Sequence, residues 1–238
     1  MSRTPQRIAG GVFRVGLGGV NAFLVETGDG GLVLVDTGTR AEARALGLAI
    51  RELGHAPRDL RGIVVTHFHG DHVGGLATVK EKTGAEVWMH PEDAAAVREG
   101  LTVRALEPGP GRLRRGIVRA IELREKRGRG REPVAVEHEV GDGETLPWDG
   151  LLALHTPGHS AGHLALLLPR DGGVLFVGDA ATNFGRLGWG PIYEDVAEGE
   201  RSLRRLAALD FEVAAFAHGS TIRSGASARF RRRWPPEG

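Results

Sequence analysis

Four side chains that can bind a metal ion lie within six consecutive residues, His67-Phe68-His69-Gly70-Asp71-His72. The apolar run at 62–66 that precedes them predicts a buried strand, and the stretch from Val73 onward predicts a helix. Imidazole and carboxylate groups packed this densely at a strand end are costly to bury unless a cation shares their lone pairs. The segment therefore predicts a metal site, with a solvated histidine-rich loop as the alternative.

The spacing within this segment divides the four side chains into two pairs. In an extended turn, residues two apart point the same way, so His67 and His69 can bind one ion. Asp71 and His72 fall on the next turn of the chain, where they can reach a second ion. The segment alone thus allows a second ion beside the first.

Composition limits the chemistry of such a site. The 238 residues include no cysteine, so every metal ligand must be nitrogen or oxygen, and disulfides and a cysteine nucleophile are excluded. The formal net charge of +1 gives no overall attraction to nucleic acid or to an anionic membrane. No run approaches the roughly 20 apolar residues of a membrane span. We therefore expect a cytoplasmic protein that acts on a small molecule and does not contact a membrane; no oligomeric state is predicted.

The order of the predicted elements indicates the fold class. Hairpin-like strands at 20–27 and 31–37 are followed by a helix at about 40–53 and by strand–helix alternation to 99. The second half repeats this order, with strands near 134–140, 151–156, 163–168 and 174–178, a helix at about 195–209, a strand at 212–217 and a terminal helix at 226–234. Two such halves that stack their sheets face to face form an α/β fold with four αββα layers. Periodicity alone also permits a doubly wound sheet.

Residues 101–132 differ in composition from the rest of the chain. They contain ten Arg or Lys residues against four Glu, and apolar residues recur at helical spacing between 113 and 121. We expect one domain over 1–238 with an arginine-rich helical insert at about 101–132. The insert is either a solvated helix, a lid beside the site or an anion-binding patch. It has no interleaved aromatic residues for base stacking, so nucleic acid is not the expected partner.

Three later positions repeat the pattern of a polar side chain at a strand end. His159 lies on a Pro-Gly turn, Asp179 follows Phe176-Val177-Gly178, and His218 follows Ala215-Phe216-Ala217. A glycine beside or just before each of these residues lets the side chain project into a cleft from a rigid base. One such residue is a weak signal, but three of them beside the 67–72 segment strengthen the metal-site prediction.

Together these residues resemble the metallo-β-lactamase-fold hydrolase superfamily over most of the chain. Asp36 in Val35-Asp36-Thr37-Gly38, the HxHxDH segment, His159, Asp179 and His218 follow in the family's order. The resemblance implies the αββα sandwich with a metal cleft at one edge. It implies that the first ion is bound by His67, His69 and His159, that the second is bound by Asp71, His72 and His218, and that Asp179 bridges both. Asp36 resembles the aspartate that supports the ligand loop rather than binding metal.

The residue types also define a reaction class. Two close cations lower the pKa of a shared water, so a metal-bound hydroxide can attack an electrophilic carbonyl or phosphorus near neutral pH. Asp71 is the expected catalytic residue, because it can accept the water's proton or orient the nucleophile. We expect two divalent ions, zinc first, with iron or manganese as alternatives, because nitrogen–oxygen sites accept all three.

Fold and metals do not identify the substrate. We expect an enzyme that hydrolyses an ester, thioester or lactone. A phosphodiesterase or nucleic-acid-processing hydrolase that uses the arginine-rich insert is the first alternative, and an iron-binding redox protein of the same fold is the second. The loop at 183–193, with Trp189 and Tyr193, is expected to form one wall of the cleft and to set substrate choice with the insert; the alternative is that the loop packs its own aromatic side chains against the core.

Overall fold

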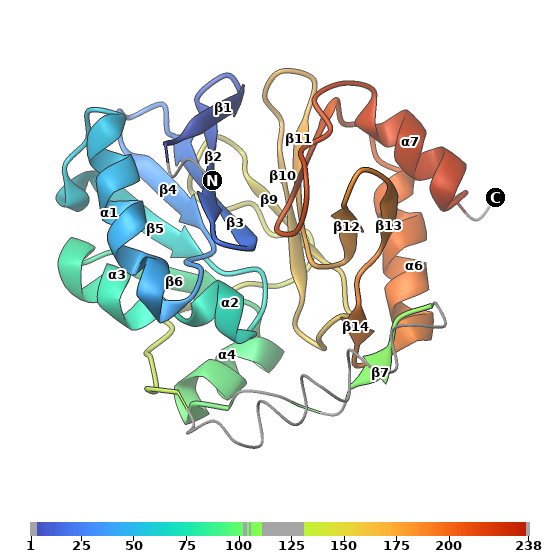
Figure 1. Ribbon diagram of the computed structural model, residues 1–238, viewed down its shortest axis with the longest axis horizontal. Coiled ribbons are helices and arrows are strands. Elements are labelled where there is room, and N and C mark those ends of the chain that lie inside the picture. Colours follow the sequence, from blue (N-terminus) through green and yellow to red (C-terminus); the bar gives the residue numbers. More distant parts are fainter. Residues whose placement is uncertain (1–3, 102–103, 105, 111–130, 237–238) are drawn as a thin grey trace.

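Two β-sheets packed face to face form the centre of the molecule (Figure 1). The computed structural model describes the chain except for residues 1–3, 102–103, 105, 111–130 and 237–238. Within the described residues, no helix is long and apolar enough to cross a membrane.

The first sheet has seven strands in the order β1-β2-β3-β4-β5-β6-β8. Strands β1 to β4 are antiparallel neighbours, whereas β4, β5, β6 and β8 run parallel. The strands are β1 (Gln6–Ala9), β2 (Val12–Leu17), β3 (Val20–Glu26), β4 (Leu32–Val35), β5 (Leu60–Val64), β6 (Glu86–Met89) and β8 (His138–Glu139). The change to parallel pairing requires crossover connections, which the helices between these strands provide.

The second sheet has four strands in the order β15-β11-β10-β9. Its strands are β9 (Leu152–His155), β10 (Leu164–Leu168), β11 (Val174–Gly178) and β15 (Val213–Phe216). Strand β10 is antiparallel to both β9 and β11, and β15 is parallel to β11. Consequently β9, β11 and β15 all end at the same edge of the sheet.

Helices cover the outer face of each sheet (Figure 1). Helices α1 (Ala43–Glu52) and α3 (Leu76–Thr83) lie on the first sheet, and α6 (Val196–Ala207) and α7 (Ala226–Arg233) lie on the second. Helix α2 (Gly70–Val73) is a single turn at the sheet edge, and α4 (Pro91–Glu99) follows β6. A 3₁₀ turn (Arg40–Glu42) leads into α1, and the side chain of Glu42 accepts hydrogen bonds from the backbone and hydroxyl of Thr39 at the start of that turn.

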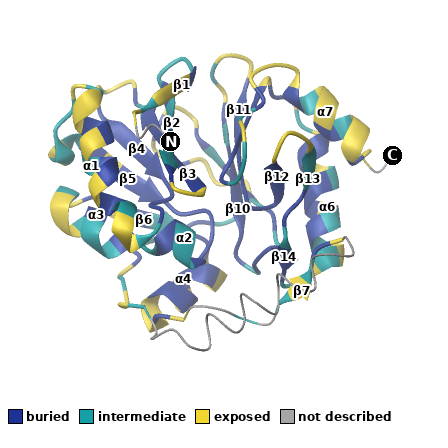
Figure 2. Cartoon of the chain, viewed as in Figure 1, coloured by how far each residue is buried: buried dark blue, intermediate teal, exposed yellow. Residues whose placement is uncertain are grey.

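Three hydrophobic clusters fill the three spaces between the four layers. Strand β3 shows how one strand serves two of them: Ala22 and Leu24 face the helices, whereas Phe23 and Val25 face the second sheet. The space between the sheets also contains Phe176, whose ring centroid lies 5.4 Å from that of Phe23. A third cluster packs beneath α6 and α7. Buried residues therefore line both faces of each sheet (Figure 2), and the predicted four-layer αββα sandwich is confirmed.

Several short elements differ from the sequence prediction. Strands β1 and β2 were not predicted, because Gly10 and Gly11 interrupt the apolar pattern that identifies them. The predicted strand at 134–140 is limited to β8, and the loop after Asp179 forms a hairpin of β12 (Ala181–Asn183) and β13 (Leu187–Trp189). Most of the predicted arginine-rich insert, residues 111–130, lies outside the described residues.

The packing between the sheets predicts a large effect of Phe176→Ala. The side chain is fully buried against Phe23, so its loss leaves a cavity that rigid strands cannot close. We expect the free energy of unfolding, measured by urea denaturation, to fall by about 3–5 kcal/mol. Leu48→Ala on the exposed face of α1 is the control and should change it by less than about 0.5 kcal/mol. Equal effects of the two substitutions would contradict the placement of Phe176 in the central core.

Candidate metal centre

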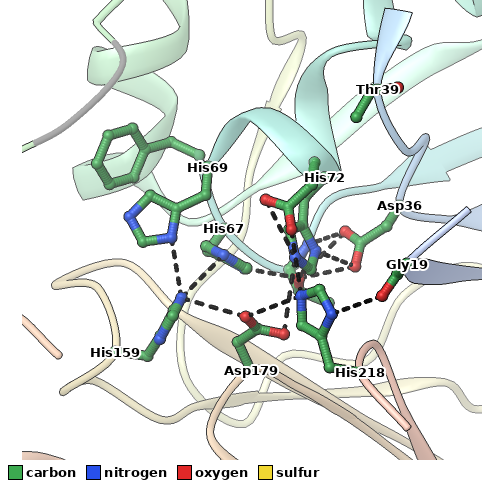
Figure 3. A network of polar contacts seen from close by, with 12 residues as sticks. Gly19, Asp36, Thr39, His67, His69, His72, His159, Asp179 and His218 are labelled. Carbon is green, nitrogen blue, oxygen red and sulfur yellow. Dashed lines mark hydrogen bonds and ion pairs between the residues drawn. The ribbon is translucent and has the colours of Figure 1, made fainter. Parts of the chain in front are cut away.

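The polar residues singled out in the sequence lie at the carboxyl ends of five strands. Asp36 follows β4, the 67–72 segment follows β5, His159 lies on the turn after β9, Asp179 follows β11, and His218 follows β15 just after Ala217. All five strands end at the same edge of the sandwich, so segments far apart in the chain meet there (Figure 3).

His67, His69 and His159 form the first and more buried group. Their ligand atoms converge: Nδ1 of His69 lies 2.9 Å from Nε2 of His159, which lies 3.1 Å from Nε2 of His67. No more than 8% of any of the three residues is exposed. The three side chains could hold one metal ion between them.

Asp71, His72 and His218 form a second group that is open to solvent. Nε2 of His218 lies 3.1 Å from Oδ2 of Asp71, and Nε2 of His72 lies 3.8 Å from its Oδ1. The side chain of Asp71 is 42% exposed and that of His218 is 19% exposed. This group also places one ligand atom from each residue within reach of a single ion.

Asp179 lies between the two groups (Figure 3). Its Oδ2 is 3.5 Å from Nε2 of His159 in the first group and 3.4 Å from Nε2 of His218 in the second. Its Oδ1 is 3.6 Å from Nε2 of His72. One carboxylate thus faces ligand nitrogens of both groups.

Asp36 orients one histidine of each group. Its carboxylate accepts a hydrogen bond from Nδ1 of His72 at 2.8 Å and from the backbone and hydroxyl of Thr66. Because the hydroxyl of Thr66 donates its proton to Asp36, the hydroxyl oxygen of Thr66 can accept a hydrogen bond from Nδ1 of His67, 3.0 Å away. This network fixes both rings so that Nε2 points toward the centre. Asp36 itself has φ 61°, a left-handed backbone conformation that turns its side chain back toward β5.

Backbone carbonyls orient two further imidazoles. Nδ1 of His159 donates to the carbonyl of Ile192 at 2.9 Å, and Nδ1 of His218 donates to the carbonyl of Gly19 at 2.9 Å. In each ring the other nitrogen, Nε2, is left facing the cluster. This is the arrangement that metal-binding histidines commonly use.

His163 holds the backbone of Asp179. Its Nε2 accepts a hydrogen bond from the Asp179 amide at 3.0 Å, while its Nδ1 lies 2.8 Å from the hydroxyl of Thr156. Burial holds the pKa of His163 well below its usual range, so the neutral ring can serve as an acceptor. These contacts make His163 a hydrogen-bonding residue beside the site. His155, by contrast, stacks on His90 and joins neither group.

The carboxylates make the electrostatic potential of the centre favourable to cations. Burial lowers the pKa of His72, but Asp36, Asp71 and Asp179 outweigh it and raise that pKa to about 9. Asp179 raises the pKa of His218 to about 11, although burial opposes the change. Burial favours protonation of Asp71, yet His72 and His218 hold its pKa well below the usual range. A bound metal ion would replace the protons that this potential attracts.

The first group favours a metal ion for a different reason. Burial lowers the pKa of His67 and His159, so both rings are neutral. With their Nδ1 protons directed outward, the Nε2 lone pairs face each other at 3.1 Å. Among the described residues, the buried Oδ1 of Asp179 also has no hydrogen-bond partner. A divalent cation satisfies such convergent lone pairs, so the residues present fit a metal.

All seven residues predicted to bind metal are brought together, although whether they bind it stays a prediction. For Trp189 and Tyr193 of the 183–193 loop, the structure agrees with the alternative that these side chains pack against the core. Tyr193 is fully buried, with its hydroxyl donating to the carbonyl of Ala180, and Trp189 packs edge-to-face against Trp234.

Sequence reasoning missed Thr66 and Asp93. Asp93 in the first turn of α4 has the pattern of an ordinary helix start.

Residues 15–218 match the metallo-beta-lactamase superfamily. The chain belongs to this superfamily. A solved structure with the same fold is a HARLDQ-motif mutant of the metallo-beta-lactamase from Cronobacter sakazakii. It is 27% identical, covers 90% of this chain and 80% of its own, and superposes with a TM-score of 0.69.

Curated relatives include enzymes named for hydrolysis. A hydroxyacylglutathione hydrolase of Pseudomonas aeruginosa is 33% identical over 65% of this chain and 45% of its own length. An atrochrysone carboxyl ACP thioesterase of Aspergillus fumigatus is 27% identical over 87% of this chain and 39% of its own length. Two further curated relatives, the protein YobT of Bacillus subtilis and the lactamase-like protein aptB of Emericella nidulans, are matched over 61% and 53% of their lengths, so the chain spans only part of the relatives it matches.

The hydrogen-bond network at Asp36 predicts that Thr66→Val destabilises the metal-free protein. Valine has the shape of threonine but leaves Nδ1–H of His67 without an acceptor in a buried site. An unsatisfied buried donor costs about 1–3 kcal/mol, which urea denaturation of chelator-treated protein should detect. Thr66→Ser keeps the hydroxyl and should be closer to the wild type. If serine and valine destabilise the protein equally, the hydroxyl does not link Asp36 to His67.

Proposed function

We propose that this protein is a metal-dependent hydrolase that binds two divalent ions. His67, His69 and His159 would hold the first ion, and Asp71, His72 and His218 the second. Asp179 would contact both. Zinc is the first candidate, because five imidazoles and two carboxylates form a borderline ligand set; iron and manganese suit the same ligands.

The position of Asp179 is the observation that carries the proposal. Its carboxylate faces His159 on one side and both His72 and His218 on the other, at 3.4–3.6 Å. A single ion would use only part of this arrangement. Two neighbouring ions sharing one carboxylate account for all seven side chains.

The unequal exposure of the two groups sets the direction from which substrate approaches. The first group is buried, whereas Asp71 and His218 are partly exposed. A substrate would therefore meet the second group first, with Asp71 beside it. The buried imidazoles exclude water from the rear of the site, which strengthens electrostatic interactions there.

Asp71 is the proposed catalytic residue. Its carboxylate is ionised at neutral pH, since His72 and His218 hold its pKa low. It can accept a hydrogen bond from an attacking water through one oxygen and fix the orientation of that water. Divalent ions at such a site supply Lewis acidity and lower the pKa of water. Asp36 and His163 keep His72 and Asp179 in place during this step.

The proposed substrates are esters, thioesters or lactones. Two curated relatives are named hydroxyacylglutathione hydrolase and carboxyl ACP thioesterase, which supports acyl-transfer chemistry to water. The phosphodiesterase alternative relied on the arginine-rich stretch. The two arginines of this stretch that the structure describes contact other protein groups. Arg104 pairs with Asp93 and Glu194, and Arg131 donates to the carbonyl of Phe68. The described part of the stretch therefore provides no argument for a phosphodiester substrate.

Metal content measured together with a substrate panel tests the proposal. Protein purified without added metal and then loaded with zinc should hold close to two ions per chain. It should hydrolyse at least one ester, thioester or lactone faster than it hydrolyses a phosphodiester. Chelation should abolish this activity and zinc should restore it. Retained activity in a metal-depleted His69→Ala variant would contradict the proposed chemistry.

The role of Asp71 predicts a kinetic effect of Asp71→Asn. The amide keeps the size of the carboxylate but cannot take a proton, so kcat should fall by about 10²–10⁴-fold. The measurement is steady-state kinetics on the best substrate of the panel, with zinc content determined on the same sample. Asp29→Asn, on the distant β3–β4 turn, is the control and should leave kcat unchanged. An unchanged kcat in Asp71→Asn at full zinc content would remove Asp71 from the mechanism.

A further inference from the structure

We propose that Asp93 is a positioning residue that sets the spacing of the first metal group. It lies in the first turn of α4, outside all seven proposed ligands, and is fully buried. The inference rests on the proposed metal centre and adds to it. Asp93 joins the two loops that carry His67, His69 and His159.

The carboxylate of Asp93 accepts hydrogen bonds from both loops. Its Oδ2 accepts from the amide of Phe68, which separates His67 from His69, at 3.3 Å. The same oxygen accepts from the hydroxyl of Ser160 at 2.6 Å, and Oδ1 accepts from the amide of Gly162 at 3.1 Å. Both of these partners lie on the turn that carries His159. Gly162 allows the close approach, because a Cβ there would lie 2.6 Å from the Asp93 nitrogen.

Arg104 supplies the positive charge that a buried carboxylate needs. Its Nη2 forms an ion pair with Oδ1 of Asp93, and its Nε donates to Glu194 at 2.8 Å. Glu194 accepts in turn from the amide of Ala161 at 2.7 Å, on the same turn as His159. The Arg104 guanidinium also lies 4.4 Å from the centroid of the Phe68 ring. Charge and packing therefore both connect the two loops.

The donor set requires a carboxylate at position 93. Each carboxylate oxygen of Asp93 accepts from two donors. Two of these four donors are backbone amides, which can donate a hydrogen bond but cannot accept one. An asparagine presents only one oxygen, and its NH₂ group must face donors on the other side. Asp93→Asn thus keeps the volume of the side chain but loosens one of the two loops.

Among the described residues, the hydrogen bonds that Asp93 accepts from the ligand loops come from positions beside ligands of the first group, Phe68 and the turn of His159. The second group has other supports: Asp36 orients His72, and the Gly19 carbonyl orients His218. Asn21 also donates to the carbonyls of Phe216 and Gly219, on either side of His218. Loss of the Asp93 carboxylate should therefore weaken one ion and leave the other in place.

Zinc affinity of the full chain, measured by competition with a chelator, tests this selectivity. In Asp93→Asn the affinity for one of two zinc ions should fall by about 10–100-fold, the usual effect of losing a group that orients metal ligands. The other ion should bind as in the wild type. NMR of zinc-loaded protein labelled with ¹⁵N-histidine should show changed imidazole signals for His67, His69 and His159. The signals of His72 and His218 should stay unchanged.

Two further variants complete the test. Asp142→Asn is the matched control, because Asp142 accepts from the His155 amide and pairs with Arg205 without touching either ligand loop. It should bind both ions normally. Ser160→Ala removes one of four donors to Asp93 and should lower the affinity for the same zinc ion by a smaller factor. If Asp93→Asn does not fold, Ser160→Ala alone tests the positioning role.

Three outcomes would overturn the inference. Normal binding of both ions by Asp93→Asn, or by Ser160→Ala where only that variant folds, removes the positioning role. Equal weakening of both ions, with imidazole signals changed in both groups, identifies a general loss of structure instead. Failure of the wild type and of Asp142→Asn to bind zinc overturns the proposed metal centre itself, and is recognised because every variant then behaves alike.

Discussion

The gathering of imidazole nitrogens and carboxylate oxygens around Asp179, in a largely buried site, is the constraint on which the rest of this structure depends. Neutral imidazoles of His67 and His159 face each other at 3.1 Å, and the buried Oδ1 of Asp179 has no hydrogen-bond partner among the described residues. Such an arrangement is unfavourable in a low-dielectric interior unless a cation occupies its centre. The sandwich places it at the sheet edge, where five strand ends meet and where Asp71 and His218 reach solvent.

Groups from both sheets hold this edge together. Asp36 at the end of β4 orients His72 and, through Thr66, His67. The Gly19 carbonyl, on the turn between β2 and β3, orients His218 from the opposite sheet. Asp93 on α4 joins the two loops of the first group. Because each ligand loop is fixed by an element distant in sequence, the geometry of the site depends on correct packing of the two sheets.

The seven residues that meet at the edge could be predicted because strand ends, glycine turns and the HxHxDH spacing are local signals. The fold class followed from the order of the elements together with the resemblance to the superfamily, since periodicity alone also permitted a doubly wound sheet. The sequence predicted less about residues whose position depends on tertiary contacts. Tyr193 was expected at the cleft but is buried, since its hydroxyl finds partners in the backbone of Ala180 and Gly190. Asp93 was missed because its partners, Phe68, Ser160 and Arg104, are brought to it only by folding. Metal binding by the seven residues and the nature of the substrate stay predictions.

The central claim is that two cations occupy this edge and share Asp179. A crystal of the zinc-loaded protein, measured above and below the zinc absorption edge, tests it most directly. The account predicts two anomalous difference peaks, one among His67, His69 and His159 and the other among Asp71, His72 and His218, with Asp179 beside both. A fully loaded crystal that shows no peak at these residues, or a single peak that leaves one group without an ion, would contradict it.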